Sequence, residues 1–190
     1  MSSSSAVQAA AYWQPTLFRA VVAAAFGALS IFWQEPAQGL VSLATGVYLL
    51  LTGASLGLLA RRPEAARQAR LLGGAAAVLA VAGVLVPLFP TPAAFAWLTA
   101  AALVLSGAAE LLLWWRGRVQ EAAASVLAKD WLITGGVAVG FGAALPFFAR
   151  LGAHALLGVA GAAAIITAVV LLIAALSYRH DAAGSGAVRQ

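Results

Sequence analysis

The chain has 190 residues, of which 63% are hydrophobic and only 9% are charged, and its formal net charge is +5. Soluble domains carry about 25% charged residues, so this composition predicts an integral membrane protein and argues against a soluble one. The sequence has no cysteine, which excludes disulfides, thiolate metal sites and thiol catalysis. The basic residues form no stripe and no known nucleic-acid-binding pattern, so we expect no nucleic-acid partner.

Six apolar segments are long enough to cross a membrane, which takes about 20 residues. We expect spans at 15–33, 38–60, 71–89, 93–115, 131–149 and 153–178. They form one transmembrane domain over 15–179, flanked by flexible tails at 1–14 and 180–190. No basic region precedes the first span, so we expect no cleavable signal peptide.

Short turns at 34–38, 90–92 and 150–152 predict three antiparallel hairpins, at 15–60, 71–115 and 131–178. Longer polar connections at 61–70 and 116–130 join the hairpins. The first is compatible with a helical turn that continues into the third span. The second has apolar residues at helical spacing, which leaves a helix on the membrane surface and a plain loop both open. The apolar residues in question are Val119, Ala122, Ala123 and Val126.

An internal repeat closes the first helix of each hairpin. Each copy has a glycine, three further residues, Ile or Pro, an apolar residue and an aromatic residue, and the copies begin at Gly27, Gly83 and Gly142. Repetition of this kind indicates the architecture directly. The predicted fold is therefore all-α, a polytopic membrane protein with six transmembrane helices arranged as three pseudo-repeated helical hairpins.

Orientation follows from the distribution of Lys and Arg, which favour the cytoplasmic side. The side with both termini and both long connections carries ten of them, whereas the side with the short turns has only Arg150. We therefore expect both termini to be cytoplasmic. Trp and Tyr favour the membrane–water boundary and fit this model. We expect Tyr12, Trp13, Trp114, Trp115, Trp131 and Tyr178 at the inner boundary and Trp33 and Trp97 at the outer one.

Ionisable residues near or within the spans are the first candidates for chemistry. Glu110 is the only acidic residue inside a predicted span, about 7 Å from the inner boundary at 1.5 Å rise per residue. It is either a proton or cation site or a structural carboxylate that pairs with Arg19 or Arg116. Arg150 and His154 lie near the third short turn, where His154 is either a sensor of external pH or an ordinary interfacial side chain.

Small residues four apart are candidates for close helix packing. The pairs are Gly53 with Gly57 and Gly136 with Gly140, and both a dimerisation face and packing within the monomer remain open. The second helix of each hairpin also repeats a hydroxyl residue, at Thr52, Ser106 and Thr167. A hydroxyl can bond a carbonyl of its own helix, so we expect a packing role for these three.

Signatures of catalysis are missing from the sequence. We find no plausible nucleophile with a His and acid partner, no metal-ligand spacing and no Walker-type Gly-Lys-Ser/Thr, so we expect no enzyme activity, no metal and no cofactor. The spans carry few polar residues and no internal break, which argues against a transporter. Pro87 and Pro146 sit at helix ends and need not interrupt a span.

With its hairpins aligned, the chain resembles the HdeD family of small six-span bacterial membrane proteins. The resemblance covers about residues 17–179. It rests on the Gly27, Gly83 and Gly142 motifs, the turn prolines Pro36 and Pro90, and the helices that carry Thr52-Gly53-Ala54 and Ser106-Gly107-Ala108. The third hairpin departs from this pattern, since it lacks a turn proline and has Thr167-Ala168. The resemblance implies an acid-resistance or envelope-stress role at the bacterial inner membrane and no catalytic residues.

Three functions follow from these observations. The first is a non-enzymatic HdeD-like protein of acid or envelope stress. The second is an accessory subunit of a larger integral membrane complex. The third is a small transporter or channel that uses Glu110. The expected partners are the lipid bilayer and either further copies of the chain or a larger membrane complex.

Overall fold

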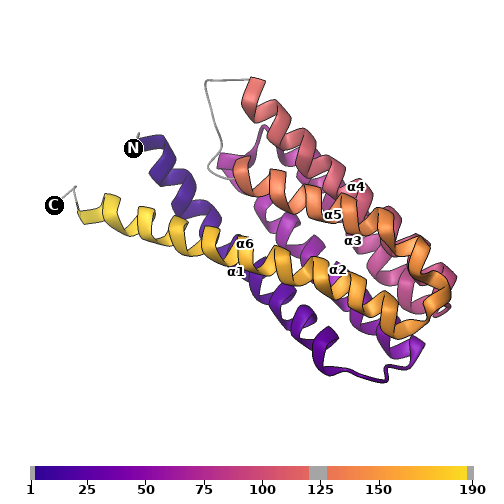
Figure 1. The fold of residues 1–190 in the computed structure, drawn as a ribbon. Coiled ribbons are helices and arrows are strands. Elements are labelled where there is room, and N and C mark those ends of the chain that lie inside the picture. Colours follow the sequence, from indigo (N-terminus) through magenta and orange to yellow (C-terminus); the bar gives the residue numbers. More distant parts are fainter. Residues whose placement is uncertain (1–2, 120–127, 188–190) are drawn as a thin grey trace.

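The computed structural model describes residues 3–119 and 128–187, and these form a bundle of six α-helices without any strand (Figure 1). All six helices contain a segment long and apolar enough to cross a membrane, which confirms the predicted fold class. The six α-helices are α1 Ser3–Phe32, α2 Gln38–Ala60, α3 Ala69–Leu88, α4 Pro92–Val119, α5 Ala128–Phe148 and α6 Ala153–Ala187.

The helix ends follow local chemistry. The hydroxyl of Thr91 accepts a hydrogen bond from the backbone N–H of Ala94 at 3.2 Å and caps the start of α4. Gly152 precedes α6 with φ of 89°, a conformation that favours glycine. In the first polar connection, a 3-10 turn at Pro63–Ala65 precedes α3, which begins only at Ala69. The choice between a surface helix and a plain loop for the connection at 116–130 concerns mostly residues 120–127, which lie outside the described residues.

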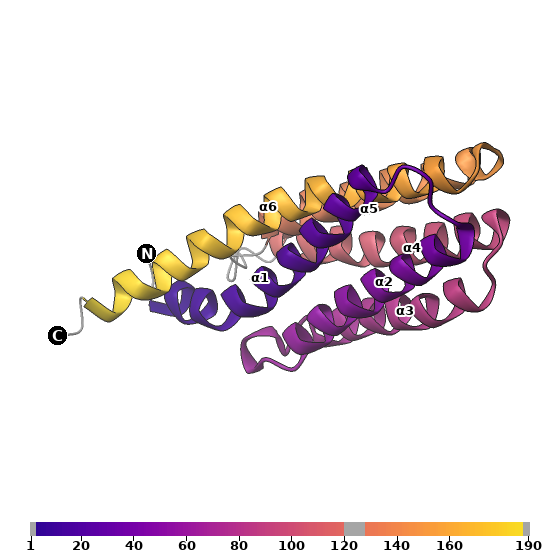
Figure 2. The ribbon, with the colours of Figure 1, turned by 90° about the horizontal axis from the view of Figure 1, so that it is seen from below.

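Both terminal helices are longer than predicted. The expected tails at 1–14 and 180–190 are helical over 3–14 and 180–187. α1 and α6 pack against each other in the most extensive helix pair of the structure (Figure 2). The packing includes Ala9 and Tyr12, which are 0% and 1% exposed.

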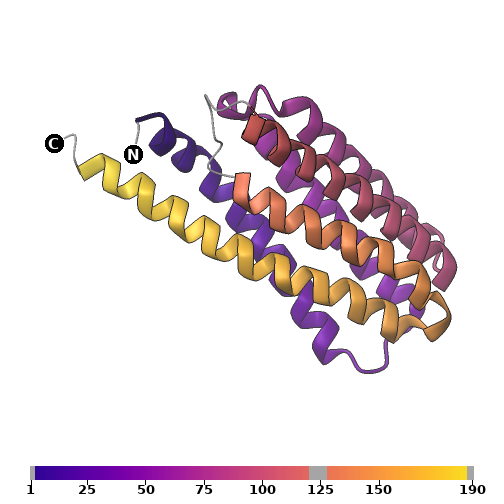
Figure 3. The ribbon, with the colours of Figure 1, turned by 45° about the horizontal axis from the view of Figure 1, so that its top comes forward.

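By their contacts the helices form a closed ring, because each one contacts its neighbours in sequence and α6 returns to contact α1. Figure 3 shows α6 crossing α1. The most extensive contacts join α1 with α6, α2 with α3, and α4 with α5. These tight pairs differ from the predicted hairpins, whose partners α1 and α2, α3 and α4, and α5 and α6 share smaller contacts. A short turn keeps two helices adjacent, but side-chain size decides how closely their axes approach.

Glycine accounts for the tight pairs, because it lets two helix backbones approach closely. A Cβ on Gly83 of α3 would lie 2.8 Å from the carbonyl oxygen of Gly46 on α2, and one on Gly142 of α5 would lie 2.9 Å from Cβ of Leu103 on α4. A Cβ on Gly27 of α1 would meet the side chain of Ile165 on α6 at 2.5 Å. The three motif glycines thus all lie in inter-helix contacts, one in each tight pair.

Aromatic residues expected at the membrane boundary are of two kinds in the structure. Trp97 and Trp115 are 67% and 60% exposed and face outward. Tyr12, Trp131 and Tyr178, which we expect at the inner boundary, are buried inside the bundle. The hydroxyl of Tyr178 donates a hydrogen bond to the carboxylate of Asp130, which explains why it turns inward.

Candidate functional site

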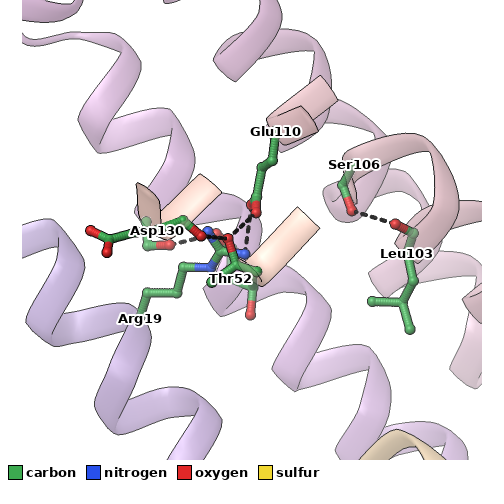
Figure 4. Close-up of polar contacts among 8 residues, drawn as sticks. Arg19, Thr52, Leu103, Ser106, Glu110 and Asp130 are labelled. Atoms are coloured by element: carbon green, nitrogen blue, oxygen red, sulfur yellow. Dashed lines mark hydrogen bonds and ion pairs between the residues drawn. The ribbon is translucent and has the colours of Figure 1, made fainter. Parts of the chain in front are cut away.

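The strongest candidate site is a buried ion pair between α1 and α4. Nη2 of Arg19 lies 2.6 Å from Oε1 of Glu110, and the two side chains are 11% and 2% exposed (Figure 4). Glu110 is the only charged residue among the buried side chains that the structure describes. Pairing with Arg19, one of the two partners weighed from sequence, is therefore present. A buried charge in a membrane is costly unless it is paired in this way.

Thr134 of α5 completes the environment of Glu110. Its hydroxyl donates a hydrogen bond to Oε2 of Glu110 and also lies 2.8 Å from the backbone carbonyl oxygen of Asp130. A hydroxyl has a single proton and therefore donates to one of these oxygens at a time. Oε2 of Glu110 thus accepts a hydrogen bond from α5, whereas Oε1 forms an ion pair with Arg19 of α1 but no hydrogen bond among the described residues. The site ties three helices together.

A cavity of about 20 Å³ lies beside the ion pair at the centre of the ring. Side chains from all six helices line it, including Arg19 of α1, Tyr48 of α2, Leu79 of α3 and Thr134 of α5. A cavity needs about 10–15 Å³ to hold one water molecule, so this one has room for a single water. Its polar lining makes a bound water favourable, and Nε of Arg19 is buried without a hydrogen-bond partner among the described residues.

The three repeated hydroxyl residues converge on this same cavity. Thr52 of α2, Ser106 of α4 and Thr167 of α6 are all buried, and each of them lines it. Ser106 donates a hydrogen bond to the carbonyl of Leu103 in its own helix at 3.3 Å, the local bonding that the sequence suggests (Figure 4). The sequence indicates that these residues repeat, but not that they meet.

A second cavity of about 20 Å³ lies on the side of Arg19 toward the chain termini, where Thr16, Ser55 and Asp130 contribute polar groups. Arg19 lines both cavities. Each has room for about one water molecule, which is much less than a hydrated ion requires. The geometry is that of a closed polar layer within an apolar bundle.

The other ionisable candidates lie apart from this layer. Arg150 belongs to a 3-10 turn at Ala149–Leu151, and His154 lies in the first turn of α6. Both side chains are exposed, at the end of the bundle opposite the chain termini. Among the described residues neither forms an ion pair, and no group of three His, Asp or Glu side chains has a metal-binding arrangement.

The four candidate packing glycines divide into two pairs. A Cβ on Gly53 would lie 2.9 Å from the carbonyl oxygen of Ala76 on α3, and one on Gly57 would lie 3.8 Å from Cβ of Ala76. These two pack within the chain. A Cβ on Gly136 or Gly140 would have nothing within 4 Å, so packing within the monomer does not account for these two glycines. The spacing is the same in both pairs, but α5 turns these two glycines away from its neighbours.

Thr134 is the site residue that the sequence reasoning missed. A single threonine in an apolar span is common and attracts no attention by itself. The internal repeat contains the signal, because Arg19 and Thr134 both lie eight residues before their motif glycines, Gly27 and Gly142. Aligned positions on α1 and α5 thus meet the same carboxylate. The chain matches no family model, and no curated protein or solved structure matches it.

Proposed function

We propose that this integral membrane protein is a non-enzymatic scaffold of the bacterial inner membrane with a role in acid or envelope stress. One observation carries the proposal: Glu110, the buried charge, is neutralised by Arg19 and held by Thr134 at the centre of the bundle. A carboxylate that is paired with an arginine and accepts a hydrogen bond from a threonine, beside cavities of about 20 Å³, suits a structural role better than a transport site.

The stress role rests on the resemblance to the HdeD family. Survival of a deletion strain after exposure to low pH tests it, with the strain complemented by the wild-type gene as control. We expect the deletion to lower survival and the complemented strain to recover it. Equal survival of the deletion strain and the wild type would remove the stress role.

The proposed topology has both termini in the cytoplasm. The distribution of basic residues supports it, because Arg61, Arg67, Arg116 and Arg179 lie at the end of the bundle that holds the termini. Among the described residues, Arg150 is the only Lys or Arg at the other end. The positive-inside rule then gives the orientation.

A second candidate function is that of an accessory subunit in a larger integral membrane complex. The outward face of α5 favours it, since Gly136 and Gly140 are exposed there and would let a helix of another protein approach closely. Purification in a mild detergent tests this candidate. A monomer without a co-purifying protein would count against it.

Transport through Glu110 is the alternative that the closed polar layer disfavours. Reconstituted proteoliposomes provide the test, with proton flux compared between the wild type and Glu110→Gln. We expect no flux above that of protein-free vesicles. A flux that the substitution abolishes would replace the scaffold with a transporter.

A further inference from the structure

A groove of about 480 Å³ opens between α1 and α2, at the end of the bundle that carries the chain termini. Its walls are Gln14, Pro15 and Phe18 of α1 and Leu58 of α2, together with Arg61 and Arg62 just beyond α2. Small-molecule sites occupy about 300–1,000 Å³, so the groove is large enough for a ligand and much larger than either cavity beside Glu110.

The polar part of the groove is positively charged. Arg61 is exposed and Arg62 is partly buried, and neither forms an ion pair in the part of the chain that the structure describes, where Arg19 and Glu110 make the single pair. Neither guanidinium donates a side-chain hydrogen bond to a described residue. Two adjacent guanidinium groups with free donors are suited to a phosphate group, which they bind through paired N–H···O bonds.

The apolar part of the groove lies one helical turn deeper in the membrane. Leu58 precedes Arg61 by three residues, about 4.5 Å along the helix axis. Leu58 is 51% exposed and Phe18 is 39% exposed, so both offer apolar surface to the groove. Because α2 is long and apolar enough to cross a membrane and ends at Ala60, we expect the arginines at the membrane boundary and the apolar wall within the hydrocarbon.

We propose that this groove is a binding site for an anionic phospholipid of the phosphatidylglycerol type. Arg61 and Arg62 contact the phosphate, and Phe18 and Leu58 pack along the first carbons of an acyl chain. The order of groups in the groove matches a phospholipid, charged at the boundary and apolar below it. A zwitterionic lipid would bring an ammonium group beside two uncompensated guanidiniums, so the charge of the groove favours an anionic headgroup.

Native mass spectrometry of the full-length protein in a neutral detergent tests the proposal, with added phosphatidylglycerol or phosphatidylcholine. We expect wild-type protein to retain phosphatidylglycerol preferentially. A basic side chain near an anionic membrane surface contributes a factor of about five in affinity, so Arg61→Gln with Arg62→Gln lowers phosphatidylglycerol affinity by about 25-fold.

The matched control is Arg67→Gln with Arg70→Gln, which removes the same charge a few residues further along the chain and outside the groove. We expect it to bind phosphatidylglycerol like the wild type. Equal loss of phosphatidylglycerol affinity in both double variants would indicate general surface attraction and overturn the proposed site. Unchanged affinity in both double variants would overturn it as well. The helical circular dichroism signal and the elution volume in size-exclusion chromatography check that each variant is folded. Arg61→Lys with Arg62→Lys, which keeps both charges, should retain part of the binding that the glutamine double variant loses.

Two further arms distinguish the lipid from other occupants. Phe18→Ala should weaken phosphatidylglycerol binding, because the acyl chain loses its apolar wall. Inorganic phosphate in excess should leave the bound lipid in place. Displacement by phosphate together with an unaffected Phe18→Ala variant would identify a free-anion site and refute the lipid proposal, and a protein retained in the groove in place of lipid would refute it as well.

Discussion

Breaking the buried ion pair should destabilise the bundle strongly, and removing both charges should not. Arg19→Met leaves the carboxylate of Glu110, whose side chain is 2% exposed, with the hydroxyl of Thr134 as its only partner. Removing one member of a buried pair costs about 3–5 kcal/mol, because the remaining charge is buried and unpaired. Glu110→Leu should cost less, since the side chain of Arg19 is 11% exposed and can extend toward water.

The double variant Arg19→Met with Glu110→Leu should recover near wild-type stability. Replacing a buried pair with apolar residues of similar size is often neutral or stabilising. Thr134 stays satisfied in this variant, because its hydroxyl can donate fully to the carbonyl oxygen of Asp130 at 2.8 Å. We therefore expect a coupling energy between the two positions of at least about 2 kcal/mol.

Unfolding by dodecyl sulfate in mixed micelles, followed by tryptophan fluorescence, measures this cycle, and the chain has six tryptophans to report on it. The reasoning is refuted if each single variant loses less than about 0.5 kcal/mol, or if the double variant loses the sum of the two single losses.

Three further predictions concern packing, hydrogen bonding and topology. Gly107→Ala should destabilise the bundle by about 1–3 kcal/mol in the same unfolding assay, because its Cβ would lie 2.8 Å from a carbonyl oxygen of α5. Gly140→Ala should be neutral or stabilising by up to about 1 kcal/mol, since nothing lies within 4 Å of the added Cβ. Equal losses of unfolding free energy in Gly107→Ala and Gly140→Ala would refute the packing account. Thr134→Val should cost about 1–3 kcal/mol by removing a buried donor, and Thr134→Ser should restore most of it; no rescue by serine would show that the hydroxyl is unimportant. In a chain without cysteine, Ala66→Cys should react with an impermeant thiol reagent only after cells are opened, whereas Gln34→Cys should react in intact cells; the reverse pattern would invert the topology.

The sequence predicts the helices well and their packing poorly. Hydropathy locates six spans because an apolar run of about 20 residues has few alternatives in a lipid bilayer. It misses the helical parts of 3–14 and 180–187, because a polar residue ends the apolar run in the sequence although the helix continues past it. The short turns favour hairpins, but the closest contacts follow glycines such as Gly46 and Gly83, whose facing partners lie on other helices.

The candidate site was predictable only in part. Glu110 stands out as an acidic residue in an apolar span, but Arg19 is 91 positions away, and no local pattern selects it over Arg116. Side-chain orientation is equally hidden, because Gly53 and Gly136 have the same spacing to a second glycine and face opposite environments. Contacts between distant helices depend on the rotation of each helix about its own axis. The faces of these helices differ little in apolar content, so the sequence does not determine that rotation.

The most direct test of the scaffold account is the survival at low pH of a deletion strain that expresses the double variant Arg19→Met with Glu110→Leu. This variant removes both buried charges and should preserve the bundle. The account predicts survival equal to that of the strain with the wild-type gene, at equal levels of membrane-inserted protein. Loss of survival with a folded and inserted double variant would contradict it, because the charges would then act in the function and not in the fold.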